Sequence, residues 1–215
     1  MKYEIGTEKP EIFTTTWPGQ YEVFSHYEFT CGIPHLIFAI TTYKENGLPN
    51  ICLHSWSCFQ GDEGGYYAIL AGLGPYTHTF ANIKRTGEFG INFLDKKYYD
   101  ALIKTIASNK EDADEFEIGG FTQKKASVIN VPLMNESFLS LECKAENIID
   151  ISKAGKSAMI IGKVVNAFVE EEYAKGIDQK YSQEGFMFNI HSPKIITTGE
   201  DGPTGIGTLR VDRLV

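Results

Sequence analysis

Residues 72–79 combine a turn, two threonines and a predicted helix start, a pattern that could bind an anion. A predicted strand from Tyr66 to Leu73 is followed by a glycine-containing turn and then by Thr77, His78 and Thr79. The first backbone N–H groups of a helix lack intrahelical partners and lie at its positive dipole end, so phosphate binds well there. The Thr77 and Thr79 hydroxyls would add donors. Either threonine could instead be only the N-cap of the helix.

A second group of residues lies at the end of a predicted strand from Asn50 to Phe59 and could bind a planar ring. Trp56 offers an aromatic face, and the neighbouring hydroxyls and backbone amides could hydrogen-bond ring nitrogens and oxygens. A buried core tryptophan is the alternative. Cys58 could also be a nucleophile with His54 as its base, because four residues along one strand place both on one face. Nothing else in the chain resembles a cysteine protease.

The sequence lacks the usual metal and dinucleotide motifs. Its five histidines form no H-x-x-x-H or H-E-x-x-H set, and its four cysteines form no C-x-x-C pair, which favours reduced thiols and no metal site. Gly72-x-Gly74 is not a dinucleotide fingerprint, because Thr77 stands in the place of the third glycine. His191 closes an apolar segment before a turn and could be a site residue or a plain strand-end histidine.

The elements that must position these residues are mostly strands. Lys44-Glu45-Asn46-Gly47 predicts a hairpin turn in which Asn-Gly supplies the positive φ angles. Acidic residues in Glu111–Glu117 predict an exposed loop. The expected strands are Tyr21–Phe29, His35–Tyr43, Asn50–Phe59, Tyr66–Leu73, Glu88–Phe93, Ser137–Ile149 and Ala158–Val169, and the expected helices are His78–Thr86 and Lys97–Ser108. This pattern favours a closed or partly closed antiparallel barrel over a doubly wound sheet.

Length and composition limit the class of protein. A chain of 215 residues, 42% hydrophobic and 22% charged, predicts one globular domain over residues 1–215. The net charge of -8 argues against nucleic acid or an anionic membrane as the main partner. No apolar run is long enough for a membrane helix, and the start Met1-Lys2-Tyr3-Glu4 lacks the apolar core of a signal peptide, so we expect a cytoplasmic protein.

Eight short motifs occur in an order that resembles the flavin reductase-like family, which includes the flavoredoxins. They are G-L-P-N (47–50), S-W (55–56), T-H-T-F-A-N-I (77–83), T-G-E-F-G-I-N-F (86–93), D-E-F-E-I-G-G-F-T (114–122), V-P (131–132), L-E-C (141–143) and I-I-G-K-V (160–164). Each motif alone is weak, and their order makes the set specific. The resemblance implies a mainly β fold, a Greek-key split β-barrel with a few short helices, which forms a homodimer and binds FMN at the subunit interface.

The resemblance also implies which residues bind the cofactor. By analogy, His54, Ser55, Trp56, Ser57, Cys58 and Phe59 would follow the flavin ring and ribityl chain, and Thr77, His78, Thr79 and Asn82 would lie at the phosphate, with His191 as a further flavin contact. Similar proteins often carry Arg or Lys where this chain has Gly74 and Pro75. The cation for the phosphate would then come from Lys84, Arg85 or Lys163.

The activity implied is that of an NAD(P)H-dependent flavin reductase, in which a nicotinamide passes a hydride to N5 of FMN. The cofactor supplies this chemistry, so a chain without a triad or carboxylate pair can still be catalytic. Two alternatives stay open: an FMN-binding electron carrier with no NAD(P)H site of its own, and a flavin-free barrel that binds another ligand.

Overall fold

The computed structural model describes residues 1–107, 109–152, 155–176, 185–190, 194–210 and 212–213. The chain forms two compact units, one of Met1–His35 with Phe188–Gly207 and the other of Leu36–Met187 with Thr208–Val215. The second, larger unit contains every predicted site residue except His191, which lies outside the described residues.

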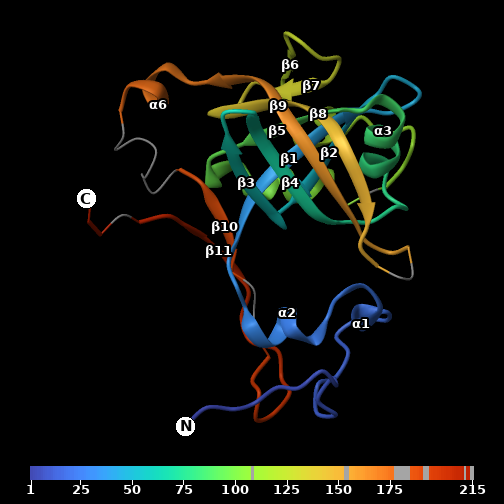
Figure 1. Ribbon diagram of the computed structural model, residues 1–215, viewed down its shortest axis with the longest axis vertical. Helices are drawn as coiled ribbons and strands as arrows, with labels where there is room; N and C mark the ends of the chain where they lie inside the picture. The colour runs from blue at the N-terminus through green and yellow to red at the C-terminus, as the bar shows by residue number, and fades with distance from the viewer. Residues whose placement is uncertain (108, 153–154, 177–184, 191–193, 211, 214–215) are drawn as a thin grey trace. The chain divides into compact units, whose positions relative to one another are not determined.

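The larger unit is built on one antiparallel sheet (Figure 1). Its strands are β1 (His35–Tyr43), β2 (Pro49–His54), β3 (Ser57–Asp62), β4 (Gly65–Leu73), β5 (Glu88–Phe93), β8 (Leu139–Asp150) and β9 (Ala158–Val169). They follow the order β1-β5-β8-β9-β4-β3, and β2 also pairs with β1. Among the strands described, none joins β2 to β3, so the sheet is curved but not closed. A second, two-stranded sheet pairs β6 (Gln123–Lys125) with β7 (Pro132–Met134).

Apolar residues on these strands form the core. Phe38 and Ile40 of β1, Leu70 of β4 and Ile160 of β9 have no exposed surface. A Cβ on Gly162 would lie 2.3 Å from the ring of Phe89, so the absence of a side chain there lets that ring pack directly on β9. The predicted ranges of β1, β5 and β9 are confirmed residue for residue.

The predicted strand Tyr21–Phe29 is wrong, because this stretch of the smaller unit forms two short helices. They are α1 (Gln20–Val23) and α2 (His26–Cys31). The Ser25 side chain accepts the backbone N–H of Tyr27, and Gly32 ends α2 in the left-handed region at φ 55°. Local capping at both ends of α2 therefore outweighs the β-forming character of the aromatic residues.

The predicted strand Asn50–Phe59 is also wrong in its continuity. Strand β2 ends at His54 and β3 begins at Ser57, and between them the Trp56 carbonyl accepts the backbone N–H of Ala71 at 2.9 Å. His54 and Cys58 consequently lie on different strands, so the prediction that they share one face of a continuous strand fails.

The helices of the larger unit agree in part with the prediction. Helix α3 (His78–Thr86) has the predicted bounds, whereas the expected helix Lys97–Ser108 is a 3-10 turn, η1 (Lys96–Tyr98), followed by α4 (Tyr99–Thr105). Short helices α5 (Glu115–Gly119) and α6 (Glu171–Lys175) were not predicted. None of the described helices has the length and apolar character needed to cross a membrane.

The predicted turn at residues 44–47 joins β1 to β2. The backbone N–H of Lys44 donates to the Leu48 carbonyl at 2.9 Å, and Gly47 has a φ of 84°. The positive φ that was predicted for Asn46 is wrong: in the described part of the chain, every residue with a positive φ is a glycine.

The smaller unit also contains most of β10 (Met187–Ile190) and of β11 (Gly205–Thr208), which are neighbours in a sheet. Within this unit the buried ammonium group of Lys194 lies 2.6 Å from the Asp201 carboxylate, and the Lys194 backbone N–H donates to the Phe29 carbonyl. The bond between Lys194 and Phe29 joins its N-terminal and C-terminal segments.

Candidate functional site

A cleft of about 330 Å³ lies between β2 and the start of α3, within the larger unit. Its lining residues come from β2, from the segment before and at the start of α3, and from the segments of α4 and α5: Asn50, Ile51, Cys52, Leu53, Tyr76, Thr77, His78, Thr79, Thr105, Ile106, Asn109 and Glu115. Three of the predicted site residues, Thr77, His78 and Thr79, therefore meet in one cleft. None of residues 54–59 lines it.

The start of α3 presents free backbone donors at this cleft. The Thr77 hydroxyl accepts the N–H of Phe80 at 3.3 Å and donates to the Gly74 carbonyl at 2.8 Å, so Thr77 is the N-cap, one of the two alternatives. The N–H of Ala81 is bonded to the Thr77 carbonyl. This leaves the N–H groups of His78 and Thr79 with no acceptor among the described residues, the condition under which a helix start binds an anion.

Thr79 and Asn82 are buried and connect α3 to the strands beneath it. The Thr79 hydroxyl accepts a hydrogen bond from the Asn50 side chain at 2.9 Å, and the Asn82 amide donates to the Thr42 hydroxyl at 2.9 Å. Thr79 reaches the cleft and Asn82 is not among its lining residues. The contacts of Asn82 are structural, and its role toward a ligand stays a prediction.

The lysines and arginine proposed as phosphate cations are directed elsewhere. Lys84 is exposed in the last turn of α3, about 9 Å along the helix axis from His78. Arg85 donates to the Tyr43 carbonyl at 2.7 Å, and Lys163 donates to the Gly64 carbonyl at 2.9 Å. Among the residues that line the cleft, His78 is the one whose side chain can carry a positive charge.

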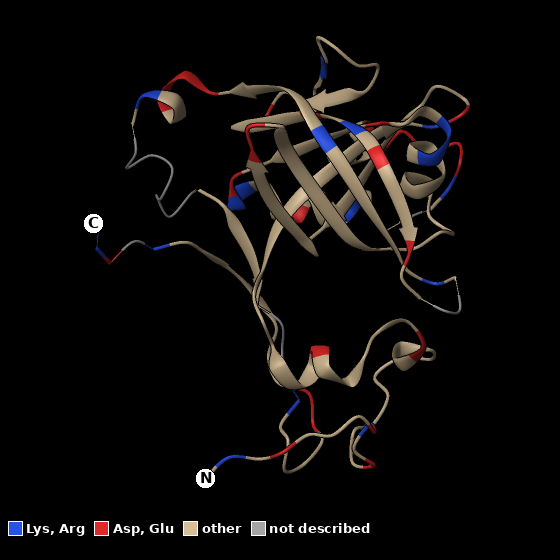
Figure 2. Cartoon of the chain, viewed as in Figure 1, with Lys and Arg blue, Asp and Glu red and all other residues tan. Residues whose placement is uncertain are grey.

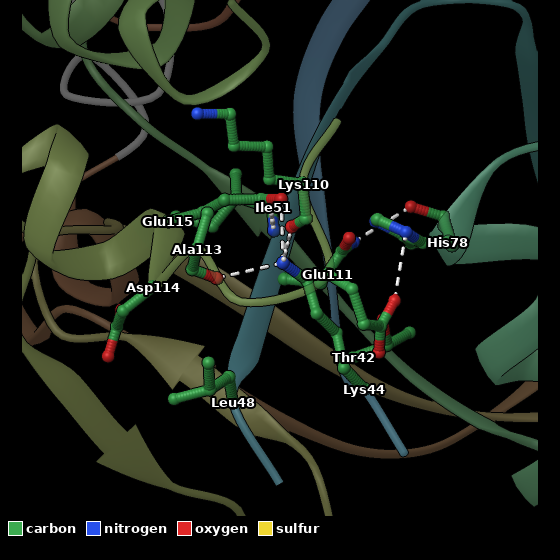
Figure 3. Close-up of polar contacts among 12 residues, drawn as sticks. Thr42, Lys44, Leu48, Ile51, His78, Lys110, Glu111, Ala113, Asp114 and Glu115 are labelled. Carbon is green, nitrogen blue, oxygen red and sulfur yellow. Dashed lines mark hydrogen bonds and ion pairs between the residues drawn. The ribbon is translucent and has the colours of Figure 1, made fainter. Parts of the chain in front are cut away.

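His78 makes one polar side-chain contact in the described structure. Its Nε2 lies 3.0 Å from the Glu111 carboxylate, and because that group only accepts, Nε2 carries the proton (Figure 3). Its Nδ1 is buried and has no hydrogen-bond partner among the described residues.

His54, at the end of β2, is buried and neutral. Burial lowers the pKa of His54 to about 4, although hydrogen bonds to the backbone of Trp56 and Ala71 act in the opposite direction. Its Nε2–H donates to the Trp56 carbonyl at 3.0 Å. At neutral pH His54 therefore supplies no positive charge and instead orients the backbone of Trp56.

Trp56 is half-buried, so it is not a fully buried core residue. Its ring lies against Gly72, where the position of a Cβ would be 3.3 Å from the ring and the φ is 72°. The ring centroid is 6.1 Å from that of His54. A side chain at residue 72 would contact the indole. Glycine at this position therefore permits both the positive φ and the close packing of the Trp56 ring.

The other predicted ring contacts lie in different environments. Ser55 is buried, and the Ser57 hydroxyl is buried without a hydrogen-bond partner in the part of the chain described. Cys58 is exposed. The Phe59 ring packs in the core, 5.5 Å from Phe38 between centroids.

The acidic segment Glu111–Glu117 is only partly the exposed loop that was predicted. Glu115 is buried, and its carboxylate lies 3.4 Å from the buried ammonium group of Lys44 and accepts the backbone N–H of Ile51 (Figure 3). Lys44 also donates to the carbonyls of Lys110 at 2.9 Å and Ala113 at 2.8 Å. Burial raises the pKa of Glu115, and the hydrogen bond from Ile51 and the charge of Lys44 offset only part of this rise. The prediction is wrong for Glu115, because Lys44, remote in sequence, provides its counter-ion.

Two of the four thiols, those of Cys52 and Cys143, give no support to nucleophilic chemistry. Cys52 lines the cleft, but burial raises its pKa to about 11, so the group is a neutral thiol. Burial also raises the pKa of Cys143. Across the described ranges, no cluster of three or more His, Cys, Asp or Glu residues could hold a metal ion.

Comparisons with known proteins identify the family. Residues 31–186 match the model of the flavin reductase like domain. The chain belongs to this family. It is 28% identical over 183 residues to the uncharacterized protein BH2278 of Halalkalibacterium halodurans, an alignment that covers 76% of this chain and 88% of the relative.

Solved structures share the fold of this family member. A split-barrel protein of Shewanella frigidimarina, assigned as a flavin reductase, superposes with a TM-score of 0.72 at 20% identity, over 99% of this chain and 98% of that one. An FMN-binding protein of Thermus thermophilus with bound p-hydroxybenzaldehyde superposes with a TM-score of 0.68 at 14% identity, over 100% and 99%. The predicted split barrel and the family resemblance are therefore confirmed.

Sequence reasoning missed several cleft residues. Asn50 ends the G-L-P-N motif and Glu115 lies in the D-E-F-E motif, so these two motifs carried a usable signal. Cys52 and Thr105 carry no such sequence signal. Cys52 reaches the cleft through the pairing of β2 with β1, and Thr105 reaches it through the packing of α4.

Proposed function

We propose that the protein is an NAD(P)H-dependent flavin reductase that binds FMN, with the phosphate in the cleft at the start of α3. The observation that carries the proposal is the group of donors there, in a chain of the flavin reductase like domain family. The N–H groups of His78 and Thr79, the Thr79 hydroxyl and the His78 ring all belong to this one cleft. The similar Thermus thermophilus protein is described as FMN-binding.

One buried polar atom without a partner, the Ser57 hydroxyl, supports a fit between these residues and a flavin. Such atoms are uncommon, because buried polar groups are nearly always hydrogen-bonded. In the described residues, the Ser57 hydroxyl has no hydrogen-bond partner. Ser57 follows Trp56, so this atom belongs to the segment proposed for the ring.

The chain's own residues would bind and orient, and the flavin, when bound, would supply the capacity to accept a hydride. Trp56 offers an aromatic face held by Gly72 and by the neutral imidazole of His54. Thr79 is fixed by Asn50, which keeps its hydroxyl in the cleft wall. Cys52 presents a protonated thiol, which adds no negative charge beside a phosphate.

A second copy of the chain is part of the proposal, because part of one face of the sheet carries apolar residues that are not fully buried. The exposed Cys58 pairs with the half-buried Ile69, which pairs with the half-buried Ile161, so the three share a face. Their neighbours Ala68 and Ile160 point into the core. Figure 2 shows few charged residues on β3, β4 and β9. We expect light scattering to give the mass of a homodimer, and a monomer would contradict this part of the proposal.

Anaerobic mixing tests the activity. We expect the protein loaded with FMN to lose the visible flavin absorption on addition of NADH or NADPH, much faster than free FMN does under the same conditions. A protein that binds FMN but is not bleached faster than the control is the electron carrier of the alternative. A protein that does not bind FMN contradicts the proposal altogether and favours a flavin-free barrel.

A further inference from the structure

The contact between His78 and Glu111 occupies a ring N–H donor that the proposed phosphate site would use. His78 lines the cleft, and Glu111 is not among its lining residues. The imidazole is mostly covered, with 20% of its side chain exposed, and its Nδ1 is buried. Nε2 is therefore the one ring nitrogen left as a donor for an anion, and in this structure a carboxylate already accepts from it.

The backbone that carries Glu111 is fixed, whereas its side chain is free to turn away. The Glu111 carbonyl accepts a hydrogen bond from the Asn46 side chain at 2.8 Å, and Lys44 binds the carbonyls of Lys110 and Ala113 on either side. The Glu111 side chain is 56% exposed, and its carboxylate contacts His78 in Figure 3. Exchanging the carboxylate for another anion needs a side-chain rotation and no movement of the segment.

Two other cations of this region, Lys44 and Arg85, do not compensate for Glu111. Lys44 is committed to Glu115 and to two carbonyls, and Arg85 is committed to the Tyr43 carbonyl. A phosphate at the His78 and Thr79 N–H groups would meet a carboxylate of like charge at the same imidazole. Like charges a few ångströms apart near a protein surface repel measurably, and the repulsion is screened by salt.

We propose that Glu111 is a specificity-determining residue that competes with the flavin phosphate for Nε2 of His78. This inference rests on the proposed function and deepens it. The Glu111 carboxylate occupies the donor that the phosphate would use, so it lowers the affinity for FMN. Riboflavin lacks the phosphate and is not affected, so the difference in affinity between FMN and riboflavin becomes smaller. The protein thereby binds FMN as an exchangeable ligand.

The test compares the affinities of oxidised FMN and riboflavin, measured by flavin fluorescence titration without nicotinamide. Glu111→Gln removes the charge, and Asp112→Asn is the matched control, an exposed acidic residue one position along. We expect Glu111→Gln to tighten FMN binding about threefold to tenfold at low salt, with less effect at high salt, and to leave riboflavin unchanged. Asp112→Asn should change neither by more than about twofold.

His78→Gln completes a double-mutant cycle with Glu111→Gln. We expect His78→Gln to weaken FMN binding and to abolish the gain from Glu111→Gln, because the two residues act through one contact. Weaker FMN binding in Glu111→Gln would overturn the inference, since Glu111 would then position His78. An equal gain in Asp112→Asn, or an equal gain for riboflavin, would also overturn it. If the wild-type protein binds neither flavin, the proposed function itself fails, and the inference fails with it.

Discussion

Replacing Lys44 by methionine should strongly destabilise the protein, because the lysine is the counter-ion of a buried carboxylate. The Lys44 side chain is 1% exposed and that of Glu115 is 4% exposed. Removing the ammonium leaves the Glu115 carboxylate with the Ile51 N–H and removes the donor to the Lys110 and Ala113 carbonyls. Breaking one side of a buried ion pair costs about 3 to 5 kcal/mol.

This loss should depend on pH in a defined direction. Burial raises the pKa of Glu115 in the folded protein above its unfolded value, so the folded state holds this proton more tightly. The stabilisation from that proton is complete at acid pH and is lost as the pH rises through the raised pKa. Lys44→Met removes a charge that lowers this pKa, so the variant should lose more stability than the wild type between about pH 4 and neutrality.

Urea denaturation followed by circular dichroism measures the effect, with two further variants as controls. Lys44→Met/Glu115→Gln, which removes both charges, should recover about half of the loss, since the amide oxygen introduced by Glu115→Gln can still accept from Ile51 and only the two carbonyls lose a donor. Lys110→Met changes an exposed lysine of the same segment and should cost less than about 0.5 kcal/mol. A loss below about 1 kcal/mol for Lys44→Met, or a double variant no more stable than the single one, would refute the reasoning.

Substitutions at three other positions test the cleft, the ring site and the core. Thr79→Ala should weaken FMN binding by roughly 1 to 3 kcal/mol in a titration while Thr79→Ser retains it, and equal affinities would count against the phosphate assignment. Trp56→Ala should alter the spectrum or affinity of bound flavin more than it alters the melting temperature; a variant that only unfolds would restore the core-tryptophan alternative. Burial opposes ionisation of Glu142, but hydrogen bonds from Asn166 and three backbone N–H groups outweigh it and lower the pKa of Glu142. The ionised Glu142 therefore stabilises the fold above its unfolded pKa, about 4.3, and this stabilisation is lost as the pH falls. We expect the difference in free energy of unfolding between wild type and Glu142→Gln to shrink in acid. A difference that does not change with pH would contradict this account.

The parts of the fold that the sequence predicts are those specified by nearby residues. Helix α3 has its N-cap at Thr77 and its left-handed C-cap at Gly87, and both signals lie within the segment itself. Strands β5 and β9 are predicted because runs of apolar and β-branched residues are bounded by turns. The break at Trp56 was missed, because the bond that marks it comes from Ala71 on another strand.

The same distinction applies to the candidate site. Thr77, His78 and Thr79 were predicted from the strand, turn and helix start around them, and the structure brings them together. Glu115 was assigned to an exposed loop, because nothing near it in sequence shows that it meets Lys44. The ligand roles of residues 54–59 stay predictions, as the cleft is lined by the residues just before them.

The strand order of the sheet has a consequence for how the chain folds. Consecutive strands β8 and β9 are each twelve residues long and pair along their whole length with two register shifts, so this hairpin can form from local contacts. Strand β4, by contrast, takes β9 as its neighbour, with Tyr66 opposite Val164. Pairing of segments so distant along the chain closes a long loop and slows folding. During synthesis the β3–β4 hairpin should therefore wait, with its apolar faces uncovered, until β9 has left the ribosome.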